Sequence, residues 1–137
     1  MLRIETKARA RALQMLYARE AGSDDDMAHV ANGIARLTGP EPAVFDRAEE
    51  LASGVMAELA ALDQAISGAA DNWRLDRIGA IERNILRLGI HELRQGVTPP
   101  KVVIDEAVRL AHWFGGSRTP GFINGVLDKV ARADGRL

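Results

Sequence analysis

The feature that most constrains the fold is the spacing of apolar residues, which recur at intervals of three or four. The longest series has intervals of 4, 3, 4, 4, 3 and 4 and consists of Val44, Ala48, Leu51, Val55, Leu59, Leu62 and Ile66. Such spacing places apolar side chains on one face of an α-helix. No segment alternates apolar and polar residues between turn residues, as a half-buried strand would. The sequence therefore predicts an all-α protein.

Glycine and proline residues divide the chain into six or seven predicted helices. We expect helices over residues 6–21, from 23 onward, 40–68, 78–93, 100–114 and from 119 toward the C-terminus. Thr6 and Ser23 are candidate N-caps, and Pro100 suits a first helical turn. The broad apolar face of residues 78–93 predicts a helix in the middle of a bundle. We expect one domain over residues 1–137, with an N-terminal half of about 1–70 and a C-terminal half of about 71–137.

Charge is segregated along the chain, although the net charge is only −1. Residues 1–19 carry +4, residues 20–63 carry −8 and residues 64–137 carry +3. Binding to nucleic acid responds to local charge more than to the total. The near-neutral total therefore does not exclude nucleic acid as a partner.

The residues that catalysis or metal binding requires do not form a recognisable set. There is no cysteine, which excludes a disulfide framework and a thiolate metal site. His91-Glu92 begins like a zinc-binding HExxH motif, but Gln95 replaces the second histidine. We predict no catalytic residue, no metal and no cofactor, and we interpret the histidines as surface or packing residues. Neither a secretory signal nor a long apolar run is found, so we expect a cytoplasmic protein that does not enter a membrane.

Basic residues recur at helical spacing near the N-terminus. Arg3, Lys7 and Arg11 are four positions apart, and Arg9 lies among them. Residues four apart share a helix face, and such an array of cations suits phosphate groups, although an ordinary solvated helix face looks the same. Phe122, at the start of the last predicted helix, either completes the core or offers a stacking surface to an unpaired base.

Four segments resemble the NusB family of bacterial transcription antitermination factors in order and spacing. They are A-R-A-R-A-L-Q-M-L-Y (8–17), I-E-R-N-I-L-R-L-G-I-H-E-L (81–93), T-P-P-K-V-V-I-D-E-A-V-R-L-A (98–111) and F-I-N-G-V-L-D-K-V-A-R (122–132). The last two segments contain the most specific motifs. The resemblance covers nearly the whole chain and implies an all-helical fold of two small packed bundles.

The resemblance also implies a binding factor and not an enzyme. It implies contact with the boxA segment of nascent RNA and with the ribosomal protein NusE. In that assembly, RNA polymerase reads through terminators, notably in ribosomal RNA operons. The positions implied for RNA contact are Arg3, Lys7, Arg9, Arg11 and Phe122. Those implied for contact with NusE are Tyr17 and Glu82.

Two positions depart from the family pattern. Glu5 interrupts the basic N-terminal segment, and Arg118 stands where the family usually has an aspartate. An aspartate repels phosphate, whereas an arginine attracts it and can stack on a base. We therefore add Arg118 to the predicted RNA-binding residues, with the hypothesis that it partly compensates for Glu5.

Two alternatives belong to other functional classes. One is a protein–protein interaction module, such as a homodimer that hides its RNA-binding face; size-exclusion chromatography with and without RNA separates it from a monomeric RNA-binding factor. The other is the NusB-like domain of a ribosomal RNA methyltransferase. For that alternative, a chain of 137 residues leaves no room for a domain that binds the methyl donor.

Overall fold

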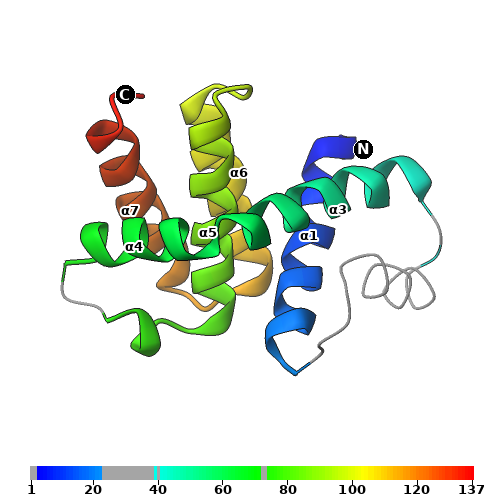
Figure 1. Ribbon diagram of the computed structural model, residues 1–137, viewed down its shortest axis with the longest axis horizontal. Helices are drawn as coiled ribbons and strands as arrows, with labels where there is room; N and C mark the ends of the chain where they lie inside the picture. The colour runs from blue at the N-terminus through cyan, green and yellow to red at the C-terminus, as the bar shows by residue number, and fades with distance from the viewer. Residues whose placement is uncertain (1–2, 23–38, 40, 72–73) are drawn as a thin grey trace. The chain divides into compact units, whose positions relative to one another are not determined.

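A computed structural model of the chain describes residues 3–22, 39, 41–71 and 74–137 (Figure 1). The elements are α1 (Ile4–Glu20), α3 (Pro42–Ala57), α4 (Leu59–Ala69), the short 3₁₀-helix η1 (Leu75–Arg77), α5 (Ala80–Gln95), α6 (Pro100–Phe114) and α7 (Thr119–Ala133). No strand occurs within these described ranges, which confirms the all-α prediction. The helix expected to begin at Ser23 lies outside the described residues, as does His29.

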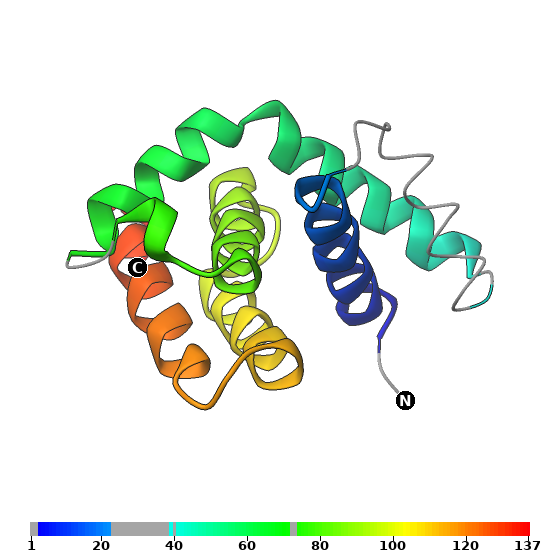
Figure 2. The same cartoon turned by 90° about the horizontal axis from the view of Figure 1, so that it is seen from below.

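The chain divides into two compact units, unit 1 (residues 1–57) and unit 2 (residues 58–137). In unit 1, α1 packs against α3, and the two helices lie side by side in Figures 1 and 2. In unit 2, α4, α5, α6 and α7 pack together. The sequence places the two halves on either side of about residue 70, whereas the two compact units meet at residues 57 and 58, because α4 packs against α5 and α7.

The single helix predicted over residues 40–68 is wrong, because two helices occupy this segment. Glu58 interrupts them with φ −121° and ψ 21°, outside the helical region. The apolar series continues through the interruption, yet α3 packs on α1 whereas α4 packs on α5 and α7. Since Glu58 is neither glycine nor proline, the sequence carries no local signal for this break.

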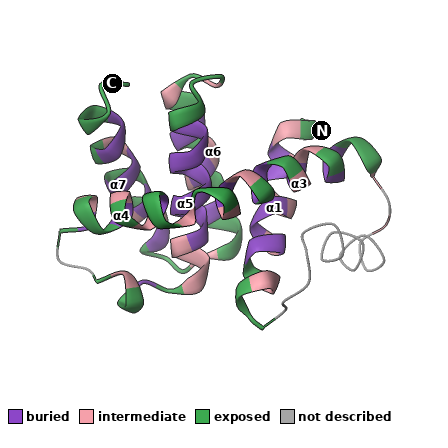
Figure 3. Cartoon of the chain, in the orientation of Figure 1, coloured by how far each residue is buried: buried purple, intermediate pink, exposed green. Residues whose placement is uncertain are grey.

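Helix α5 is the centre of unit 2, as its apolar pattern predicts. All ten residues from Asn84 to Leu93 are buried (Figure 3). Both α6 and α7 pack on this helix, and they contribute buried aliphatic side chains such as Leu110 and Leu127. Gly89 lets α7 come close, because a Cβ atom at this position would lie 2.9 Å from a methyl group of Leu127.

The helix boundaries confirm most of the predicted signals. Gly96 ends α5 with φ 70°, a left-handed conformation that favours glycine. Pro100 occupies the first turn of α6. Thr6, by contrast, is not an N-cap: α1 already begins at Ile4, and Thr6 is buried within its first turns. None of the helices in the described ranges is long and apolar enough to span a membrane.

The buried helix α5 carries a charge that another helix must balance. Arg87 donates hydrogen bonds from Nε and Nη2 to the two carboxylate oxygens of Asp63 on α4, at 2.6 and 2.9 Å. A third bond runs from Nη1 to Asn84 Oδ1 at 3.0 Å. The side chains of Arg87 and Asp63 are only 10% and 21% exposed. This two-pronged pair therefore joins α4 to the core of unit 2.

Asp63→Ala should destabilise the protein by about 3 kcal/mol, because it removes the carboxylate from a largely buried guanidinium. The measurement is the free energy of unfolding in urea. Asp71→Ala is the matched control, since it breaks the exposed Asp71–Lys129 pair, whose loss should cost less than about 1 kcal/mol. Equal losses for the two variants would contradict the structural role given to Asp63.

Candidate nucleic-acid interface

The first candidate surface is the cationic face of α1. Arg3 is exposed, and Lys7 and Arg11 are partly exposed one and two turns later. Lys7 Nζ lies 3.1 Å from Glu41 Oε2, and Arg11 donates to Gln14 Oε1 at 2.7 Å. An anion that binds Lys7 must therefore compete with one carboxylate.

Arg9 is placed differently from its basic neighbours. It is only 4% exposed, and its side chain takes part in interactions within the protein. In the described conformation it offers almost no surface to a phosphate group. The spacing of charges in the sequence does not reveal this burial, from which we expect Arg9 to have a structural role.

Glu5, which interrupts the basic segment in the sequence, is balanced in the structure. Arg47 on α3 donates from Nε to both carboxylate oxygens of Glu5, at 3.1 and 3.2 Å. Arg47 also donates from Nη1 to Glu50 Oε2 at 3.1 Å. The negative charge of Glu5 thus faces a cation from a neighbouring helix, which reduces its repulsion toward an approaching phosphate.

The second candidate surface is a pocket of about 250 Å³ in unit 2. It lies where the start of α5 meets the start of α7. Its lining comprises Arg77, Ile78, Gly79, Glu82, Arg118, Thr119 and Phe122. Three predicted site residues from two separate segments therefore line one pocket: the partly buried ring of Phe122, the exposed Arg118 and the carboxylate of Glu82.

Glu82 joins the two helix starts that form this pocket. The hydroxyl of Thr119 donates to Glu82 Oε1 at 3.4 Å and accepts a hydrogen bond from the backbone N–H of Gly116 at 3.0 Å. The other carboxylate oxygen of Glu82 points toward the start of α5, where a Cβ atom at Gly79 would lie 2.7 Å away. Glu82 was predicted to face a protein partner, and the structure places it in the same pocket as Phe122 and Arg118.

Tyr17, the other predicted partner-binding residue, lies on α1 in unit 1. Its spacing of four from Leu13 predicts an inward-facing side chain, and this prediction is wrong. Its side chain is 45% exposed, in contrast to the buried Leu13 and Leu16. Burial in the core therefore does not explain an aromatic residue at this position, and its ring is accessible to a partner.

Two residues of the pocket were missed in the sequence. Arg77 ends η1 and adds a second exposed cation to the pocket. It belongs to no recognisable sequence motif. Thr119 was identified only as the start of the last helix. Its link to Glu82 spans 37 positions in the sequence, so only the packing of α5 and α7 reveals it.

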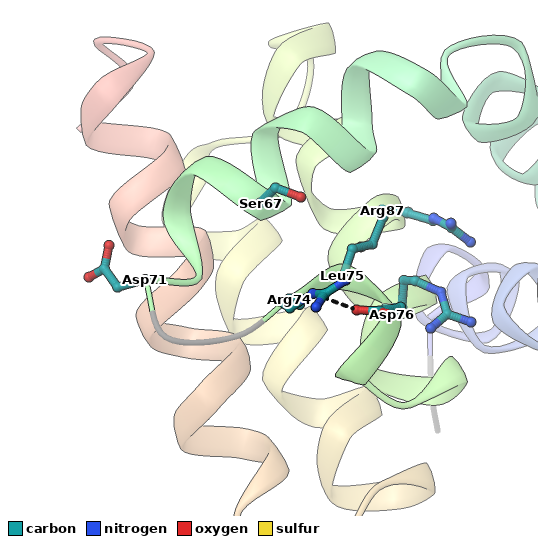
Figure 4. A pocket seen from close by; sticks show the side chains of 7 residues that line it. Ser67, Asp71, Arg74, Leu75, Asp76 and Arg87 are labelled. Atoms are coloured by element: carbon teal, nitrogen blue, oxygen red, sulfur yellow. Dashed lines mark ion pairs between the residues drawn. The ribbon is translucent and has the colours of Figure 1, made fainter.

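A larger hollow of about 970 Å³ lies elsewhere in unit 2 and is lined by residues from α4, η1 and α5 (Figure 4). Its arginines already have acceptors within the protein. Arg74 pairs with Asp76, Arg87 with Asp63, and Arg83 donates to the carbonyl oxygen of Ile78 at 2.6 Å. None of the predicted site residues lies in this hollow.

The described residues contain no group of three histidine, aspartate or glutamate side chains arranged as metal ligands. His91, which begins the incomplete HExxH motif, is buried on α5 with Nδ1 3.3 Å from Glu58 Oε2. This placement agrees with its interpretation as a packing residue. The pocket of unit 2 thus combines the cations Arg77 and Arg118 and the carboxylate of Glu82 with the aromatic ring of Phe122.

Comparison with known proteins identifies the family. The model of the NusB family matches residues 6–132, nearly the whole chain. The chain belongs to the NusB family. A NusB transcription antitermination protein from Sorangium cellulosum is 44% identical over 130 residues, which cover 94% of this chain and 92% of that protein. Transcription antitermination is thus the function named for the family members that this chain resembles.

Solved structures of NusB proteins share the fold. T. maritima NusB matches with a TM-score of 0.84 and 28% identity, covering 96% of this chain and 93% of the other. A structure described as antitermination factors NusB and NusE in complex with dsRNA matches with a TM-score of 0.85 and 24% identity, over 97% and 99% of the two chains. These matches confirm the predicted NusB-like helical architecture.

The contrast between Arg9 and Arg11 leads to a prediction about stability. Arg9→Ala should lower the free energy of unfolding by about 1–3 kcal/mol, because it removes a buried side chain together with its interactions within the protein. Arg11→Ala, on the same helix and with the same change of charge, should cost no more than about 0.5 kcal/mol. Chemical denaturation of both variants measures the difference. If Arg9→Ala left the free energy of unfolding unchanged, Arg9 would again count among the cations accessible to RNA.

Proposed function

We propose that this protein binds boxA-type single-stranded RNA together with the ribosomal protein NusE and thereby promotes read-through by RNA polymerase, notably in ribosomal RNA operons. It acts in the cytoplasm as a binding factor, without catalysis. The observation that carries the proposal is the pocket in which Phe122 lies with Arg77 and Arg118. Membership of a family named for transcription antitermination supports it further.

The cations of α1 suit the sugar–phosphate backbone of the RNA. Arg3, Lys7 and Arg11 repeat along one helix face, and Arg47 offsets Glu5 beside them. Phosphate contacts supply affinity with little dependence on sequence. In this proposal unit 1 contributes mainly to the strength of binding.

The pocket of unit 2 suits an unpaired base. An aromatic ring stacks on the face of a base, and arginine side chains bind phosphate or stack in turn. The carboxylate of Glu82 accepts hydrogen bonds, so it favours a base edge that carries an amino group. In this proposal unit 2 contributes mainly to the choice of RNA.

NusE is the protein partner in this proposal. The fold is shared with a NusB that was solved in complex with NusE and RNA, and Tyr17 offers an exposed aromatic ring of the kind enriched in protein interfaces. Because RNA then contacts two proteins at once, each protein raises the affinity of the other for the strand. No conformational switch is needed for this coupling.

The double substitution Lys7→Ala and Arg11→Ala should weaken binding of all RNAs alike and flatten its salt dependence. Each lost phosphate contact on a single strand lowers the log–log slope by about 0.7, so two contacts correspond to about 1.4. Fluorescence anisotropy of labelled boxA-type RNA over a salt series gives the slope. An unchanged slope would show that these side chains do not contact phosphate.

Two further variants sharpen this test. Lys101→Ala with Arg132→Ala removes two exposed charges from α6 and α7 and should leave the slope unchanged. Glu41→Gln removes the carboxylate that pairs with Lys7 and should strengthen RNA binding, more at low salt than at high salt.

Tyr17→Ala should weaken capture of NusE by tenfold or more, about 1.4 kcal/mol, as expected for an aromatic anchor of an interface. Titration calorimetry with purified NusE measures this affinity. The melting temperature should remain nearly constant, because the side chain is exposed. Trp113→Ala is the matched control, since it removes an aromatic ring of equal exposure from α6. Unchanged affinity for Tyr17→Ala would remove Tyr17 from the interface.

A further inference from the structure

The segment between α6 and α7 is short, and it carries Arg118 into the pocket. It comprises Gly115, Gly116, Ser117 and Arg118, and most of it is exposed. Three backbone hydrogen bonds involve the segment: Gly115 N–H donates to the carbonyl of Ala111 at 2.9 Å, Thr119 N–H to that of Gly116 at 3.1 Å, and Phe122 N–H to that of Arg118 at 3.3 Å. An exposed segment of this kind needs side-chain contacts to hold one conformation.

Thr119 supplies such contacts and is itself only 6% exposed. Its hydroxyl oxygen accepts from the N–H of Gly116, and its O–H donates to Glu82 Oε1, as described above. Gly115 packs directly on the same side chain: a Cβ atom at this position would lie 2.6 Å from Thr119 Cγ2 and 2.8 Å from its Oγ1. The start of the segment is thus held against the buried side chain of the residue that directly follows its end.

We infer that Thr119 is a positioning residue for RNA binding. Its hydroxyl links the 115–118 segment to Glu82 on α5 and so holds Arg118 at the mouth of the pocket beside Phe122. This inference rests on the proposed function. The physical reason is preorganisation: a segment already held in its binding conformation loses less entropy when the RNA binds.

The direct test is the isosteric substitution Thr119→Val, which keeps the volume and removes the hydroxyl. Affinity for a boxA-type RNA oligonucleotide, measured without NusE, should fall about two- to tenfold, the range expected from loss of ordinary hydrogen bonds. Thr119→Ser retains the hydroxyl and should restore most of the affinity. Thr98→Val, just before the opposite end of α6, makes the same chemical change away from the pocket and should leave the RNA affinity unchanged. Full affinity of folded Thr119→Val would overturn the inference.

A double-mutant cycle with Arg118→Ala separates positioning from a general loss of stability. If Thr119 acts by holding Arg118 in place, Thr119→Val should have little further effect on affinity once Arg118 is absent. The salt slope should also fall in the Thr119→Val single variant, because a phosphate contact by Arg118 is weakened. Strictly additive effects, with an unchanged slope, would overturn the inference.

A second test of the inference moves the hydroxyl of Thr119 and leaves it chemically intact. Gly115→Ala forces the side chain of Thr119 to move, whereas Gly116→Ala places its Cβ 3.9 Å from the nearest atom and should be tolerated. Gly115→Ala should weaken RNA binding to an extent similar to Thr119→Val, and this variant decides the question if Thr119→Val does not fold. Equal affinity of the two alanine variants would contradict the inference. Failure of the unsubstituted protein to bind any boxA-type RNA, even with NusE present, would instead refute the proposed function.

Discussion

The pair between Arg87 and Asp63 is the interaction on which unit 2 depends most. Helix α5 is buried over ten consecutive residues, and a guanidinium in that stretch requires a carboxylate from elsewhere. Asp63 supplies it from α4, with two short hydrogen bonds. This pair holds α4 against α5, although only Glu58 separates α4 from α3 in the sequence. Glu58, just before α4, also reaches α5: its Oε2 lies 3.3 Å from Nδ1 of the buried His91.

The candidate interface combines cations with carboxylates that restrain them. Glu41 pairs with Lys7, Arg47 faces Glu5, and Glu82 lies in the pocket with Arg77 and Arg118. Each carboxylate reduces the attraction for a general polyanion and leaves the geometry of the cation in place. A surface of this kind favours a ligand that also stacks on Phe122 over one that offers only phosphate. It also suits a factor that gains its affinity together with a protein partner.

The helix starts organise the unit 2 site. Gly79 and Thr119 stand at the beginnings of α5 and α7, and Glu82 contacts the region around both. The proposed base contact and the proposed phosphate contact are therefore held by one small network. This arrangement also brings a residue assigned to the protein partner by resemblance into the surroundings of the RNA site. In the proposed function, binding of RNA and binding of the protein partner therefore share residues in unit 2.

The sequence by itself determined the helical class, most helix ends and the identity of the central helix. Those properties depend on local rules: the apolar spacing of residues 78–93, the left-handed Gly96 and the proline at position 100. Resemblance added the positions of Phe122 and the N-terminal cations. Only the tertiary structure decided which residues are accessible. It buried Arg9, exposed Tyr17, broke the helix at Glu58 and joined Glu82 to Thr119. These outcomes depend on which distant helices pack together, and neither spacing nor local propensity encodes that pairing.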